Sequence, residues 1–103
     1  MENFAAKMDE LVAALNIIEA EKHAASKFSG PPDLVIWKNK GTKFAYIDIG
    51  TSGAWLVEKT NGEIFNIKGY GVPDYNKKKK ADIGNIATVD PRLMHTKRYN
   101  YLR

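Results

Sequence analysis

AWLVEKTNGEIFNIK, residues 54–68, carries the strongest fold signal in the chain. Two runs rich in β-branched and aromatic residues flank an Asn-Gly pair there, and type I′ hairpin turns favour this pair because they need positive φ at both central positions. Similar runs lie upstream, KFAYIDI at 43–49 and LVIW at 34–37, each followed by a glycine-containing turn. Four such runs in direct succession predict a four-stranded antiparallel meander over residues 33–68.

A long amphipathic helix is predicted ahead of the strands, over residues 3–28. Asn3 is a suitable N-cap, and Ser-Gly-Pro-Pro at 29–32 stops a helix. The stripe fits packing on the chain's own sheet, and it also fits a helix pair in a homodimer, because a heptad seam runs as far as Lys22. Its apolar side chains recur at spacings of three and four residues: Phe4, Met8, Leu11, Leu15 and Ile18.

The chain is expected to form one α+β domain over residues 1–103, with the helix packed on the sheet and a basic, loop-rich part over 69–103. It contains no cysteine, so disulfides and thiolate metal sites are excluded. The first ten residues include acidic side chains, and no apolar run approaches the ~20 residues that cross a bilayer. We therefore expect a soluble protein of the cytoplasm.

Positive charge is concentrated in the last quarter of the chain. The net charge is +4, but residues 77–103 alone hold eight lysines and arginines against two aspartates, a local charge of +6. A concentration of this kind is typical of contact with nucleic acid or another anionic partner. It is also compatible with a solvated tail that aids solubility.

The segment KGYGVPDYNKKKKADIGN, residues 68–85, is the predicted binding site. Its lysines can neutralise nucleic-acid phosphates and release counterions, while tyrosines offer faces on which bases stack. The segment can instead hold a small phosphorylated ligand, because backbone N–H groups of glycine-rich loops bind phosphate. The predicted ligand-binding residues, with two arginines further along the chain, are Lys68, Tyr70, Tyr75, Lys77, Lys78, Lys79, Lys80, Asn85, Arg92 and Arg98.

Some of these residues also have structural interpretations. Tyr70 fits an aromatic lid over the sheet edge, and Asn85 fits a turn residue beside a glycine. Trp37 and Trp55 lie in strand-like runs and are expected in the core.

Each of the last two segments of the chain fits two interpretations. Residues 81–89 fit a short strand or a helical turn. Residues 90–103 fit a short helix that Asp90 caps and Pro91 begins, and they also fit a flexible arm.

Signatures of catalysis, metal binding or cofactor binding are missing from the sequence. His23 and His95 stand apart from each other and from any metal-ligand spacing, and no phosphate-binding P-loop motif occurs. The paired carboxylates fall on the predicted helix, where they fit a solvated face. We therefore expect a protein that is not an enzyme, with no cofactor and no metal.

Residues 43–86 resemble a group of small uncharacterised bacteriophage proteins whose signature is close to T-G-D-[IV]-Y-K-P-A-S-W-K-A-P-A-K-x-x-R-G-N-I. The matched residues are NGEIF at 61–65, Tyr70 in place of the tryptophan, Pro73, Lys80 and GNI at 84–86. Ile83 stands where the signature has arginine, and PDYNKKKK is longer than the corresponding stretch. The resemblance implies a phage accessory protein that blocks a host enzyme, binds nucleic acid or sequesters a nucleotide signal used in immunity.

The leading functional hypothesis is thus a non-enzymatic, phage-type binding protein that engages nucleic acid or a nucleotide through residues 68–85. The alternative is a protein-interaction module that inhibits an acidic host protein through its basic face. In that case the tyrosines and Arg98 would anchor the interface.

Overall fold

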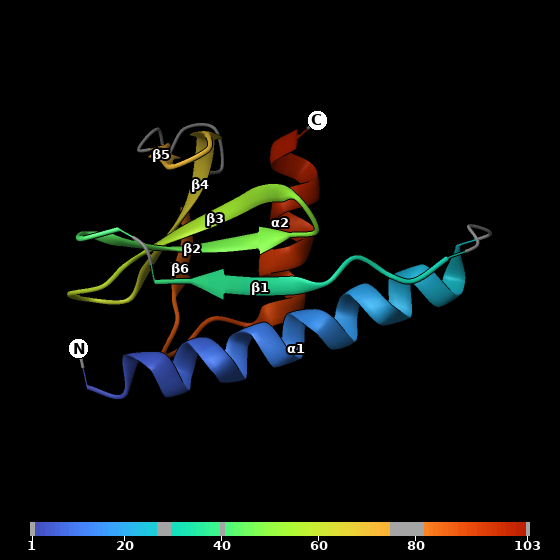
Figure 1. The fold of residues 1–103 in the computed structure, drawn as a ribbon, viewed down its shortest axis with the longest axis horizontal. Coiled ribbons are helices and arrows are strands. Elements are labelled where there is room, and N and C mark those ends of the chain that lie inside the picture. Colours follow the sequence, from blue (N-terminus) through green and yellow to red (C-terminus); the bar gives the residue numbers. More distant parts are fainter. Residues whose placement is uncertain (1, 27–29, 40, 75–81, 103) are drawn as a thin grey trace.

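The structure, a computed structural model, describes residues 2–26, 30–39, 41–74 and 82–102 (Figure 1). It confirms the α+β class: a long N-terminal helix, an antiparallel sheet and a short C-terminal helix. None of the described helices is long and apolar enough to span a bilayer. The elements are α1 (Phe4–Ala25), β1 (Val35–Lys38), β2 (Phe44–Ile49), β3 (Ser52–Glu58), β4 (Glu63–Gly69), β5 (Val72–Pro73), β6 (Asp82–Asn85) and α2 (Pro91–Leu102).

Within the described residues, the sheet has six strands where the sequence predicts four. The expected strands are present as β1 to β4, paired in chain order, but β4 is also paired along its other edge. There β6 pairs with the first half of β4, with Ile64 opposite Gly84, and β5 pairs with the second half, with Ile67 opposite Pro73. The part predicted as loop-rich thus completes the sheet, through a local pairing of β5 and a pairing of β6 that joins residues too far apart for a local pattern to reveal.

The β3–β4 hairpin forms as predicted, but its turn does not have the predicted geometry. A type I′ turn needs positive φ at both Asn61 and Gly62. Only Gly62 has it, at 77°, and its N–H donates to the carbonyl of Glu58 at 2.8 Å. Asn61 acts through its side chain instead, because its Oδ1 accepts from the N–H of Glu63 at 2.9 Å.

α1 packs its predicted stripe against the sheet of the same chain. Met8, Leu11 and Leu15 are buried in the core, and Phe4 and Ile18 pack at its margin. Full burial of such a side chain contributes about 1.5–3 kcal/mol. The face that would form a homodimer seam is therefore used within the chain.

The ends of α1 differ slightly from the prediction. The helix begins after Asn3 as expected, but Asn3 adopts a left-handed φ of 57° and makes no side-chain cap bond; its carbonyl accepts from the N–H of Lys7 at 3.0 Å. The helix ends at Ala25, and residues 27–29 of the predicted span and its stop signal lie outside the described residues.

α1 also runs alongside β1, the edge strand (Figure 1). Side chains of α1 form hydrogen bonds with this strand. The side chain of Asn16 donates to the carbonyl of Val35 at 2.8 Å and accepts from the N–H of Val35 at 2.7 Å. Two turns nearer the helix start, Asp9 accepts from the indole N–H of Trp37 at 2.8 Å. Trp37 is half-buried against the core, and Trp55 is fully buried, as expected.

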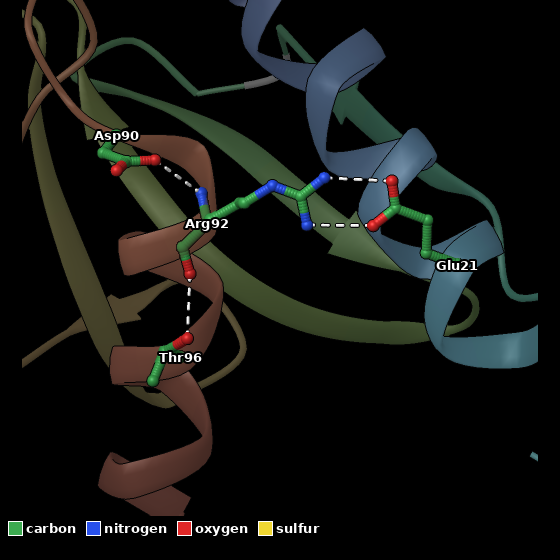
Figure 2. Close-up of polar contacts among 4 residues, drawn as sticks. All are labelled: Glu21, Asp90, Arg92 and Thr96. Carbon is green, nitrogen blue, oxygen red and sulfur yellow. Dashed lines mark hydrogen bonds and ion pairs between the residues drawn. The ribbon is translucent and has the colours of Figure 1, made fainter. Parts of the chain in front are cut away.

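α2 confirms the helical reading of the C-terminal residues. Asp90 caps it, because its Oδ1 accepts from the N–H of Arg92 at 3.0 Å, and Pro91 is its first residue (Figure 2). Met94 carries the helix into the core and is fully buried. Residues 90–102 are thus an integral part of the fold.

The two faces of the sheet differ in composition. Ala45, Ile47, Trp55, Val57 and Ile64 point into the core that α1 and α2 share. The alternate side chains form the outer face, which we define as Phe44, Tyr46, Asp48, Leu56 and Phe65. Aromatic rings dominate this face: Phe44 and Phe65 meet edge to face with centroids 5.9 Å apart.

Candidate functional site

The lysine run is attached to the sheet at two neighbouring points. The N–H of Asp74 donates to the carbonyl of Asn66 at 2.8 Å, and Asp82 is paired with Phe65, the residue before Asn66 in β4. The described residues that flank segment 75–81 are therefore held at adjacent positions of β4. Five predicted ligand-binding residues lie in this segment, outside the described residues: Tyr75, Lys77, Lys78, Lys79 and Lys80.

Tyr70 and Lys68 lie beside this point of attachment, at the end of β4. Lys68 is exposed, and the side chain of Tyr70 is 50% exposed. The ring of Tyr70 meets that of Tyr46 at 5.3 Å and lies over Gly53, where an added Cβ would come within 2.7 Å of the ring. The position over the sheet agrees with the lid interpretation.

Asp48 is a buried carboxylate that the sequence analysis did not select. Its residue is only 3% exposed. Oδ2 accepts from the hydroxyl of Tyr70 at 3.1 Å and lies 3.3 Å from the ammonium of Lys38. Oδ1 has no hydrogen-bond partner among the described residues. The sequence did offer one signal for this residue: Asp48 is the single acidic residue in the otherwise apolar strand β2. An aspartate is rarely buried in such a strand without a specific role.

A second group of polar atoms lies on the core face of the sheet. Trp55 and Asn66 are paired across β3 and β4, and both are 1% exposed. The indole N–H of Trp55 and both polar atoms of the Asn66 amide have no partner in the described part of the chain. Buried Asp74 follows β5 and donates its N–H to the carbonyl of Asn66, and the guanidinium of Arg98 lies 5.9 Å from the Trp55 ring. Arg98 is thus brought to the same end of the sheet as the lysine attachment.

Arg92 lies elsewhere, in the contact between the two helices. Its guanidinium donates two hydrogen bonds of 2.9 Å to the carboxylate of Glu21 on α1 (Figure 2). This pairing lowers the pKa of Glu21 below its ordinary value, chiefly through the hydrogen bonds, and raises the pKa of Arg92. The guanidinium of Arg92 is thus bonded to Glu21 in the described structure. A ligand that binds Arg92, as predicted, would have to compete with this carboxylate.

Asn85 is engaged in holding the β4–β6 edge together. Its amide N–H donates to the carbonyl of Asn61 at 2.6 Å, and its Oδ1 accepts from the N–H of Ala87 at 3.0 Å. These contacts agree with its reading as a turn residue. They also bring together the two ends of the phage-like signature, since Glu63 pairs with Asn85 and Ile64 with Gly84.

His95 has a partner that its isolation in the sequence concealed. Its Nε2 lies 2.8 Å from Oε1 of Glu19, and both side chains are largely buried between the helices. His23 lines a separate cavity of about 220 Å³ with Glu19, Lys22, Ser26 and Asp33. Within the described ranges, no three histidine or carboxylate side chains are grouped as metal ligands.

Comparisons of the chain with protein-family models, with curated protein sequences and with solved structures gave no match.

Proposed function

We propose that this protein is a non-enzymatic binding protein that holds a phosphate-bearing ligand, either nucleic acid or a nucleotide, at the end of the sheet where residues 68–85 are attached. A phage-type accessory role, in which the protein binds nucleic acid or sequesters a signalling nucleotide, fits this activity. The proposal depends on where the lysine run is attached.

The attachment to adjacent residues of β4 carries the proposal. Because Asp74 and Asp82 are held at Asn66 and Phe65, the four lysines belong to a short segment tied at both ends to the sheet. A free basic tail would have only one attachment. Four ammonium groups in so short a closed segment raise the local positive potential and favour a ligand with several phosphates.

The neighbouring side chains supply the second type of contact that such a ligand needs. Tyr70 is 50% exposed, and Lys68 is exposed two residues before it. Aromatic rings bind bases by stacking, which contributes about 1–3 kcal/mol per base, and cations bind the backbone. The site thus combines the two contacts of single-strand and nucleotide binding.

Salt dependence tests the proposal. A labelled single-stranded oligonucleotide is titrated with the protein over a range of salt concentrations, followed by fluorescence anisotropy. Replacing Lys77–Lys80 with alanine should reduce the slope of log K against log salt by about 2–3, since each phosphate contact on a single strand contributes about 0.7. For the nucleotide arm, small molecules retained from cell extract are identified by mass spectrometry.

A matched control removes the same charge elsewhere. The pair Lys77→Ala and Lys78→Ala is compared with Lys7→Ala and Lys22→Ala on α1, which lowers the net charge equally. The proposal predicts a larger loss of binding for the first pair. Equal losses, or binding that ignores salt while no nucleotide is retained, would contradict it.

An acidic protein partner is the second candidate. Tyr70 and Val72, on either side of the β4–β5 turn, are both about half exposed, at 50% and 51%. Exposed apolar side chains beside cations are common at protein interfaces. If this candidate is correct, the oligonucleotide does not bind, and the lysine variant binds an acidic protein partner less tightly than the wild type does.

A further inference from the structure

We propose that the outer face of the sheet contains a nucleobase site, in which a base stacks on Tyr70 and donates an N–H to Oδ1 of Asp48. This inference rests on the proposed function and deepens it. The lysine run would bind phosphate regardless of sequence, and Asp48 would select the base. The ligand class is a base with an exocyclic amine, presented by a single strand or by a free nucleotide.

The carboxylate of Asp48 is the first support. It is nine-tenths buried, and Oδ1 accepts no hydrogen bond from any described residue. Buried polar atoms are normally paired, because a lost hydrogen bond to water must be replaced. A carboxylate oxygen left over in this way is available to a donor that the chain does not supply.

The surroundings of Asp48 leave Oδ1 as the remaining acceptor. Tyr70 and Lys38 both act on Oδ2, at 3.1 and 3.3 Å, which fixes the orientation of the carboxylate. The register of β2 against β3 shifts between Ile47 and Asp48, an irregularity that re-aims side chains. Gly53 is opposite Asp48 and carries no side chain, so the Tyr70 ring can lie over it.

The rings beside the carboxylate provide the stacking surface. Tyr70 is 50% exposed, and Tyr46 meets it edge to face with the ring centroids 5.3 Å apart. Sheet faces with exposed aromatic side chains bind unstacked bases in this way. The ammonium of Lys38, with its side chain 45% exposed, adds a cation next to the base.

Oδ1 is reached when Tyr70 moves aside. The oxygen is buried while the tyrosine hydroxyl is bonded to Oδ2. This movement breaks the hydrogen bond of Tyr70 to Oδ2 and its contact with Tyr46, and the stacked base and its bond to Oδ1 would replace them. The base then takes the space next to the carboxylate and stacks on the displaced ring.

The chemistry of a lone carboxylate oxygen predicts which bases are preferred. Cytosine, adenine and guanine offer an exocyclic amine N–H at their edges, whereas the N3–H of an unpaired thymine lies between two carbonyl oxygens that a carboxylate repels. The wild-type chain should therefore bind oligo-dC and oligo-dA about tenfold more tightly than oligo-dT of equal length.

The closing experiment compares three proteins by anisotropy with oligo-dC, oligo-dA and oligo-dT: the wild type, Asp48→Asn and the variant with Lys77–Lys80 replaced by alanine. Asp48→Asn keeps the shape of the side chain but adds a donor, so it should remove the preference and leave the salt slope unchanged. The lysine variant should flatten the salt slope and keep the preference. Equal affinity of the wild type for all three oligonucleotides, or a preference that survives Asp48→Asn, overturns the base site.

The outcomes separate the two proposals. If the lysine variant flattens the salt slope and Asp48→Asn has no effect, phosphate binding is supported and the base site is contradicted. If no oligonucleotide or nucleotide binds, both proposals are contradicted. If Asp48→Asn does not fold, the ¹³C shift of the Asp48 carboxyl carbon in the wild type decides: a change that saturates with added cytidine monophosphate supports the site, and no change overturns it. Equal affinity for the mononucleotide and the oligonucleotide identifies a free nucleotide as the source.

Discussion

Asn16 holds both backbone groups of Val35, donating to its carbonyl at 2.8 Å and accepting from its N–H at 2.7 Å. The side-chain amide of α1 thus replaces the strand that would otherwise pair with this edge of β1. Edge strands with unpaired groups are templates for pairing with another chain. The contact therefore stabilises the fold and protects it from self-association.

Asn16→Leu should test both effects. It leaves the two backbone groups of Val35 without their partner, which costs about 1–3 kcal/mol of the free energy of unfolding. Chemical denaturation measures the loss, and light scattering measures association. Glu10→Leu, a substitution to the same residue at an exposed position of α1, serves as the control. Matching stability and association in the two variants would contradict the role of Asn16.

Gly53→Ala should displace the ring of Tyr70. The new Cβ would lie 2.7 Å from Cδ1 of Tyr70 and 3.0 Å from Cδ1 of Ile67, so one of them has to move. We expect a loss of about 1–3 kcal/mol in the free energy of unfolding, and a changed chemical shift for the Tyr70 ring in the NMR spectrum. Gly69→Ala is the matched control, because no atom lies within 4 Å of its added Cβ. Equal effects of the two changes would rule out the close contact.

Met94→Ala should show that α2 belongs to the cooperative fold. Met94 is fully buried, so its truncation creates a cavity and lowers the free energy of unfolding by about 2–5 kcal/mol. The neighbouring Leu93 is 52% exposed, and Leu93→Ala should change stability by about 0.5 kcal/mol or less. Denaturant titration followed by tryptophan fluorescence measures both. A small effect of Met94→Ala would contradict the packing of α2 in the core.

The Glu21–Arg92 pair should give a weak dependence of stability on pH. Because folding lowers the pKa of Glu21, the ionised carboxylate favours the folded state, and its contribution is present above the pKa of the unfolded chain. The contribution is lost as the pH falls through the lower pKa of the folded state. The melting temperature of Glu21→Gln should therefore lie below that of the wild type at neutral pH and approach it in acid.

Salt provides the check on this last prediction. Both side chains are well exposed, so added salt should shrink the difference in melting temperature at neutral pH. A difference that persists in acid and at high salt would show that Glu21 acts through packing and not through its charge.

The parts of the fold that were predictable depend on local patterns. The stripe from Phe4 to Ile18 and the alternating run KFAYIDI each fix one element through neighbours in sequence. The pairing of Ile64 with Gly84 does not, because it joins residues twenty positions apart and β6 is only four residues long. The turn at Asn61 was mispredicted because its side chain bonds to Glu63, which compensates for the missing backbone geometry.

The candidate site, like the fold, was predictable only where local sequence patterns determine it. Tyr70 could be selected from its place in a glycine-rich segment, but its partner Asp48 lies 22 residues earlier in the chain. Arg92 was counted as a free positive charge, whereas the fold brings it to Glu21, 71 residues away. Charge and composition locate a basic region, but tertiary contacts determine which of its cations are already paired.

Because Asp74 and Asp82 are held at neighbouring residues of β4, the intervening segment is closed at its base by the sheet itself. Its length has little effect on the stability of the domain, since doubling a loop costs only about 0.6 kcal/mol in closure entropy. Changes in the length or charge of this segment should therefore leave β4 intact. This edge of the sheet is a position where new specificity can evolve without a new fold.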